Sequence, residues 1–168
     1  MIHAEEALDI ARAQATELIS SGDPLFGLWT KGKWGDPVIV HDVFGNPSYW
    51  LVPLHVDAYV VGFVRVSAAG KMLAAGTFCR DPQKLITCPK VVTGLSLEEA
   101  QDMLLKDIKL APGENAGAPL FVHDGPEGRE AWSVTTMLDG KPHRWVFITP
   151  GGTYQRSAGM ILDQDLEA

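Results

Sequence analysis

The chain has few cysteines, no basic cluster and no long apolar run. Its 168 residues include two cysteines, and 14 Lys and Arg stand against 21 Asp and Glu, for a net charge of −7. A surface without clustered Lys and Arg cannot release counterions from phosphates, so we expect no nucleic-acid partner. No apolar run approaches the roughly 18 residues that cross a bilayer, so we expect no membrane partner.

The start of the chain also lacks the features of an export signal. Residues 1–21 carry four acidic side chains, and they have neither a basic start nor a continuous apolar stretch. We therefore predict a cytoplasmic location, unless a leader has been removed from the chain. That setting favours two reduced thiols at Cys79 and Cys88, and the alternative is a disulfide that closes a nine-residue step.

An internal repeat dominates what is present. Residues 35–72 match residues 117–154 without a gap at ten of 38 positions, where random pairing gives roughly two or three. The matched positions are Gly35/Gly117, Pro37/Pro119, Val40/Val122, His41/His123, Asp42/Asp124, Trp50/Trp132, Val52/Val134, Asp57/Asp139, Val64/Val146 and Gly70/Gly152. Residues 5–9 match residues 98–102 at a larger offset, so the first half has the longer connection, which includes the aromatic stretch 25–29.

Two helices are expected from the apolar pattern. Residues 4–20 place apolar side chains every three or four positions, which predicts a helix with one buried face that ends before Gly22 and Pro24. A second helix is predicted from Ser96, because Ser96 and Glu99 have the spacing of a capping box. Its buried face is expected to comprise Leu97, Ala100, Leu104 and Ile108.

Between the helices the apolar period changes to two, which is typical of strands. In each half, the pattern predicts a short strand, then the two strands of a hairpin, and then one more strand. The expected strands are residues 38–40, 50–56, 60–66 and 71–78, and in the second half residues 120–122, 132–138, 144–149 and 153–156. Asp57–Ala58 and Asp139–Gly140 stand at the hairpin turns, and Asp-Gly is a strong hairpin signal.

These elements predict an α+β fold built from two tandem helix-plus-antiparallel-sheet repeats, residues 1–90 and 91–168, with approximate two-fold symmetry. Hydrophobic residues make up 46% of the chain, which is enough for a core. A unit of about 80 residues is marginal by itself, so we expect the halves to pack as one globular unit.

A capped helix reading Ser96–Leu97–Glu98–Glu99–Ala100, followed by such strands, resembles the PepSY and cystatin-like families. In the first half, residues 49–54, 62–66 and 70–71 resemble a PepSY strand set. The resemblance implies a generic binding module, of a kind that is usually exported and that binds or restrains peptidases. The Gln-Val-Gly hairpin loop of cystatin inhibitors is absent from the sequence, so inhibition of papain-like enzymes is not implied.

His41–Asp42 and His123–Asp124 occupy equivalent places after the short strands. If the halves face each other, these residues could hold a metal ion through imidazole and carboxylate ligands. The alternative is that each Asp caps a turn while each His packs beside a tryptophan. A duplication would copy either feature.

Four tryptophans are candidate ligand-binding residues. Trp50 and Trp132 begin the main hairpins, where they form either the aromatic walls of a groove or two core anchors. Trp29 and Trp34 lie in the longer connection of the first half. There they cover the core, make a dimer contact or line a pocket.

No catalytic motif is evident in the sequence. Neither cysteine has a sequence neighbour that would make it a nucleophile, and no serine stands in a nucleophile elbow. We therefore predict a non-enzymatic binding or interaction module without a cofactor. Its partner would be a protein, a peptide or a small ligand, held at a sheet edge or between the repeats, and a homodimer is an additional expectation. The alternative is a metal-binding protein or hydrolytic enzyme that uses the two His–Asp pairs.

Overall fold

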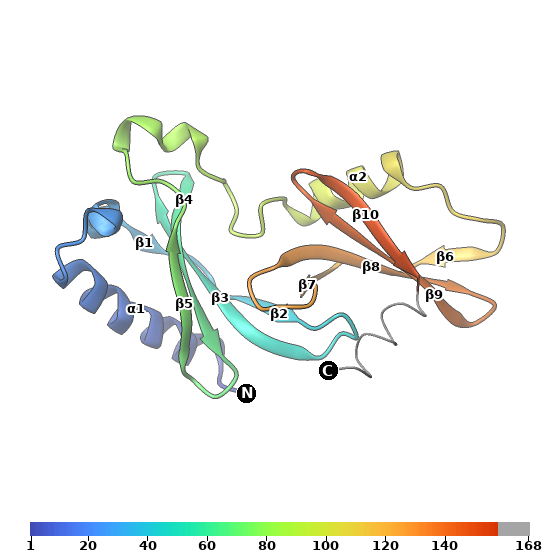
Figure 1. Cartoon of the computed structure of the whole chain (residues 1–168), viewed down its shortest axis with the longest axis horizontal. Coiled ribbons are helices and arrows are strands. Elements are labelled where there is room, and N and C mark those ends of the chain that lie inside the picture. Colours follow the sequence, from blue (N-terminus) through green and yellow to red (C-terminus); the bar gives the residue numbers. More distant parts are fainter. Residues whose placement is uncertain (158–168) are drawn as a thin grey trace. The chain divides into compact units, whose positions relative to one another are not determined.

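In the computed structural model, which describes residues 1–157, the first long element is helix α1 (Ala4–Ser20; Figure 1). Ala7, Ala11 and Ala15 are buried, so the helix has the apolar face predicted from its periodicity. The residues of the chain divide into two compact units, one comprising Met1–Gly94 and the other beginning at Leu95. The fold is α+β. No helix within residues 1–157 has the length and apolar character needed to cross a membrane.

The sheet of the first unit is antiparallel and has the order β2–β3–β4–β5, with β1 paired to β3. Its strands are β1 (Lys33–Trp34), β2 (Val38–His41), β3 (Pro47–Val56), β4 (Tyr59–Ser67) and β5 (Met72–Thr77). Helix α1 contacts β3, β4 and β5, and it therefore covers one face of this sheet (Figure 1).

Two short 3-10 helices, η1 (Pro24–Lys31) and η2 (Pro82–Thr87), complete the first unit. Each begins with an Asp-Pro step whose aspartate accepts a backbone hydrogen bond at 2.9 Å: Asp23 from the N–H of Leu25, and Asp81 from the N–H of Gln83. Neither element was predicted from the sequence, because such short helices have no apolar period to detect.

A disulfide joins Cys79 to Cys88, so the structure differs from the two reduced thiols that a cytoplasmic setting favours. The bond closes a loop that contains all of η2. Next to it, the backbone N–H of Val60 donates a hydrogen bond of 2.7 Å to the carbonyl oxygen of Pro89. The two ends of the loop are therefore fixed to each other, and the C-terminal end is fixed to β4.

The second unit contains helix α2 and an antiparallel sheet of order β10–β9–β8–β7, with β6 paired to β8. Its elements are α2 (Leu97–Asp107), β6 (Glu114–Ala116), β7 (Leu120–His123), β8 (Glu130–Leu138), β9 (Lys141–Thr149) and β10 (Gly152–Ser157). Helix α2 contacts β9 and β10.

Each unit has its own hydrophobic cluster. In the first, Phe26, Leu28 and Trp29 of η1 join the alanines of α1 and the valines of β3 and β4. In the second, Ala100 of α2 packs with Val134, Val146 and Ile148 of the sheet. Because η1 supplies large side chains, the first cluster extends well beyond the helix–sheet contact.

Most predicted elements are confirmed within two or three residues. The capping box is confirmed, since Ser96 and Glu99 exchange two hydrogen bonds of 3.1 Å. One position of the predicted buried face of α2 is wrong: Leu97, the first residue of the helix, is 43% exposed and is not part of the cluster. Strands β1 and β6 were not predicted, as each has only two or three residues.

Candidate ligand-binding site

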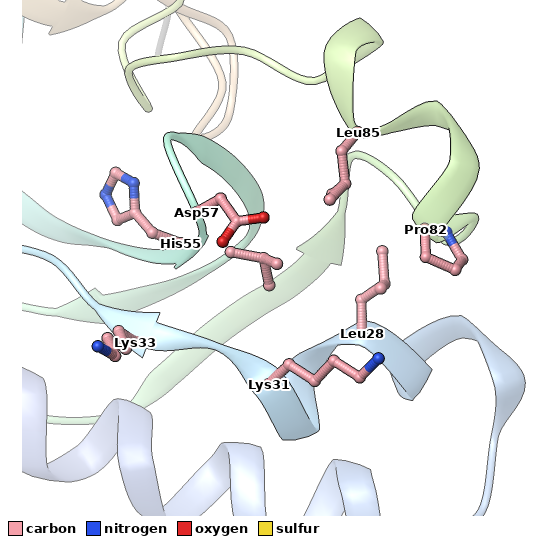
Figure 2. A pocket seen from close by; sticks show the side chains of 8 residues that line it. Leu28, Lys31, Lys33, His55, Asp57, Pro82 and Leu85 are labelled. Atoms are coloured by element: carbon pink, nitrogen blue, oxygen red, sulfur yellow. The ribbon is translucent and has the colours of Figure 1, made fainter.

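The first unit has a cavity of about 360 Å³ where η1, β1, the β3–β4 turn and η2 meet (Figure 2). Its lining residues are Leu28, Lys31, Lys33, His55, Val56, Asp57, Pro82 and Leu85. Four of these side chains are apolar and four can carry charge. Small-molecule sites usually combine apolar side chains with a few polar groups, and this lining has both, with an equal share of each.

The apolar part of the cavity is built by two facing segments. Leu28 of η1 and Leu85 of η2 point toward each other across it (Figure 2). Leu28 and Val56 are buried as parts of the hydrophobic cluster, and Leu85 packs against that cluster. The interior of the cavity is therefore an open extension of the core rather than a separate surface hollow.

The β3–β4 turn brings Asp57 to the cavity. Its φ is 54°, in the left-handed region that aspartate tolerates better than most residues. This backbone turns the chain at once after Val56, and the Asp57 side chain lines the cavity at the turn (Figure 2). The turn predicted at Asp57–Ala58 thus supplies the acidic group of the site.

The two lysines come from the side formed by η1 and β1, and their side chains extend in opposite directions along it (Figure 2). Lys31 is the last residue of η1 and Lys33 is the first of β1. Lys33 stands opposite His55 in the pairing of β1 with β3. A basic side with one carboxylate nearby favours ligands that carry negative charge.

Trp29 and Trp34 do not line the cavity, and both pack in the hydrophobic cluster of the first unit. Trp29 is 3% exposed, and its indole N–H donates a hydrogen bond of 3.0 Å to the hydroxyl oxygen of Thr77. Its ring centroid lies 6.2 Å from that of Trp34, edge to face. The face of the Trp29 indole rests on Gly62 of β4, where a Cβ atom would come within 2.6 Å of the ring nitrogen.

Trp50 and Trp132 each connect a hairpin to the segment before a helix. The indole N–H of Trp50 donates to the carbonyl oxygen of Ile2 at 3.1 Å, and that of Trp132 donates to the carbonyl oxygen of Leu95 at 2.8 Å. Both rings pack against the cluster of their own unit. These contacts match the core-anchor alternative, and neither residue lines the cavity.

Asp42 caps the turn that follows β2. Its carboxylate accepts hydrogen bonds of 2.9 Å from the N–H groups of Phe44 and Asn46, and one of 3.0 Å from the Asn46 side chain. His41, beside it, is half-buried at the end of β2. The aspartate therefore holds the β2–β3 connection in shape.

Asp124 is 1% exposed and is surrounded by donors. Arg156 lies 2.9 Å and Arg129 3.6 Å from its carboxylate, and the hydroxyl of Tyr154 donates to it at 2.7 Å. Burial of the phenol, and after it the hydrogen bond and charge of Asp124, raise the pKa of Tyr154 to about 12. Tyr154 therefore stays protonated at neutral pH and stabilises a buried charge network. Nδ1 of neighbouring His123 lies 2.9 Å from the carbonyl oxygen of Gly125.

A second buried carboxylate, Glu114, was not singled out in the sequence. It is 5% exposed and forms two hydrogen bonds of 2.8 Å with Arg144, through Nε and Nη2. It also accepts the N–H of Ala111 at 2.9 Å. The bond to Arg144 lowers the pKa of Glu114 to about 2, against the opposing effect of burial. The ion pair fixes β6 to β9.

Across residues 1–157, no group of three or more His, Cys, Asp and Glu side chains is placed to hold a metal ion. No family model matches the chain, and neither a curated protein nor a solved structure matches it. The resemblance to PepSY and cystatin-like domains therefore stays a prediction. The candidate site therefore rests on the residues that line the cavity and not on similarity to a known protein.

Proposed function

We propose that this protein is a non-enzymatic binding module and that its first unit holds a small ligand in the cavity between η1 and η2. The observation that carries the proposal is the cavity itself. Its volume of about 360 Å³ falls within the range of about 300–1,000 Å³ typical of small-molecule sites. Three of its four apolar residues, Leu28, Val56 and Leu85, belong to the core or pack against it, so they are held in place before any ligand arrives.

A sheet-edge site for a peptide is the alternative predicted from the sequence. Strand β5 ends the strand order of the first unit and contains no charged residue. An edge offers only backbone hydrogen bonds and alternate side chains. The cavity combines apolar surface with charged groups, and we therefore prefer it.

We further propose that the two units arose by duplication. The support is the register of their strands. For most pairs of residues that lie opposite each other on neighbouring strands of the first unit, adding 82 to both residue numbers gives such a pair in the second unit. Examples are Ile39–Trp50 with Phe121–Trp132, Val52–Val64 with Val134–Val146, and Trp34–Leu54 with Ala116–Thr136. Strands β5 and β10 depart from this rule. Arg65 pairs with Ala74, whereas Phe147, its equivalent in the second unit, pairs with Tyr154 instead of Arg156.

The proposed duplication makes the location of the cavity informative. Between helix and first strand, the first unit has residues 21–32 and the second has residues 108–113. The longer connection holds η1, which supplies Leu28 and Lys31 to the cavity. The binding site thus lies where the first unit departs from the shared plan.

Two further expectations stay predictions. Structural disulfides persist in oxidising compartments and are rare in the cytosol, so the Cys79–Cys88 bond weighs against the predicted cytoplasmic location. A homodimer through Trp34 is disfavoured by its packing, because the ring lies against Trp29 and the cluster of its own unit. The metal or hydrolase alternative gains no specific support from the contacts of Asp42 and Asp124.

A screen of neutral and charged fragments by protein-observed NMR tests the binding proposal. Fragments that bind should shift the amide signals of Leu28, Val56 and Leu85. Leu85→Trp fills the cavity without changing charge and should weaken binding at least about tenfold. Ile86→Trp is the matched control, because Ile86 is the next residue of η2, is 79% exposed and does not line the cavity. Binding that maps elsewhere, or that survives Leu85→Trp, would refute the proposal.

A further inference from the structure

The cavity combines an excess of positive charge with an apolar interior, in a protein whose net charge is −7. Lys31 and Lys33 border one side, and Asp57 is the acidic residue of the lining. Two ammonium groups and one carboxylate leave one positive charge, with histidine neutral. The sign of the site is therefore opposite to that of the whole molecule.

Both lysines are available to a ligand. Each is exposed, and within residues 1–157 neither takes part in a salt bridge with an acidic side chain. By contrast, Arg129, Arg144 and Arg156 of the second unit are all committed to buried carboxylates. An anion bound at the cavity would therefore gain attraction without first breaking an existing ion pair.

We infer that the ligand of this cavity is a monocarboxylate with a short apolar chain. Its carboxylate would lie at the Lys31–Lys33 side, and its chain would lie between Leu28, Val56 and Leu85. The single excess positive charge matches one negative charge. A cationic head group would instead meet two ammonium groups for one carboxylate. The modest volume selects a short chain, since larger ligands need cavities further up the usual range.

This inference rests on the proposed function, and the choice of probe separates the two. Octanoate, 1-octanol and octylammonium have the same chain and differ in the charge of the head group. Calorimetric titration of the full chain, purified without reductant, should show octanoate binding about tenfold more tightly than 1-octanol and more tightly still than octylammonium. Exposed ion pairs change affinity by up to about fivefold each, and two lysines take part.

The double variant Lys31→Ala/Lys33→Ala should lose this preference, so that octanoate and 1-octanol bind alike. Lys71→Ala/Lys90→Ala is the matched control, because it removes the same charge from exposed positions that do not line the cavity. The reversal Lys31→Glu/Lys33→Glu should make octylammonium the preferred probe. All four lysines are exposed, and a thermal melt of each variant checks that it folds.

Equal affinity for octanoate and 1-octanol, both lost on Leu85→Trp, would overturn the inference about charge and leave the binding function standing. An octanoate preference reduced equally by the control variant would overturn it too, since the effect would then come from overall charge. If none of the three probes binds, the ligand class is wrong, and the fragment screen decides on the binding function separately.

Discussion

Gly62 decides how η1 can pack on the sheet. A methyl group at this position would lie 2.6–2.7 Å from three atoms of the Trp29 indole, whereas real contacts of this kind are well above 3 Å. Trp29 has no room to withdraw, because it is buried and its N–H is bonded to Thr77. The tight contact thus fixes η1, and with it one wall of the cavity.

We expect Gly62→Ala to lower the free energy of unfolding by about 1–3 kcal/mol, the usual cost of overpacking a core. Gly27→Ala is the matched control, since a methyl group at Gly27, on η1, meets no atom within 4 Å. It should be neutral or slightly stabilising. Urea unfolding followed by tryptophan fluorescence measures both, and equal stability of the two variants would contradict this account.

Glu114 provides a test by pH. Its pKa is about 2 in the folded chain against an ordinary value of 4.5. Because the folded value is the lower one, the ionised carboxylate stabilises the fold fully above pH 4.5, and this contribution is lost as the pH falls through about 2. Removing one partner of a buried ion pair costs about 3–5 kcal/mol, so Glu114→Ala should be that much less stable at pH 7.

The difference between Glu114→Ala and the unchanged chain should shrink steadily below pH 4.5, as measured by unfolding at pH 7, 4 and 3. Other carboxylates titrate in both proteins, so their effects cancel in the comparison. A difference that stays constant down to pH 3 would show that lost packing, rather than lost charge, accounts for the effect.

At the scale of elements, the two tryptophan hydrogen bonds attach each hairpin to its helix. Trp50 and Trp132 hold the carbonyl groups of Ile2 and Leu95, which directly precede the N-cap residues of α1 and α2. The start of each helix is thereby fixed over the sheet. Trp50 and Trp132, which match in the sequence, therefore make equivalent attachments in the two units.

Replacing Trp50 or Trp132 by Phe removes the N–H donor and should cost about 1 kcal/mol for the hydrogen bond, in addition to the smaller ring. Trp34→Phe is the control for ring size, since Trp34 packs against Trp29 with the two ring planes nearly perpendicular. Thermal unfolding compares the three variants. Equal losses in all three would mean that the two indole hydrogen bonds contribute nothing beyond packing.

The same scale shows what periodicity can predict. Both α-helices and the long hairpins follow from apolar spacing, because each buries one face of a regular element. The 3-10 helices and strands β1 and β6 do not, since their positions depend on contacts with residues distant in the sequence. Strand β1, for example, exists because Lys33 and Trp34 meet His55 and Leu54.

At the scale of the whole molecule, the sequence predicts the class of fold better than the site. The matched tryptophans and the His–Asp pairs were candidate site residues because they recur in the sequence, and recurrence does not distinguish a binding role from a structural one. Most residues that line the cavity do not recur, among them Lys31, Leu28 and Leu85, and Asp57, which matches Asp139, is the exception. The two lysines were visible as a Lys-Gly-Lys step, but nothing local indicated that η2 would come to lie opposite them.

The Cys79–Cys88 disulfide couples the cavity to the redox conditions around the protein. Leu85 and Pro82 lie within the loop that the Cys79–Cys88 disulfide closes, so cleaving that bond frees the wall that faces Leu28. Linkage is reciprocal: if the intact bond improves retention of an occupant, the occupant must make the bond harder to cleave by the same factor. A thiol reagent and the ligand would then act as antagonists, although they touch different atoms.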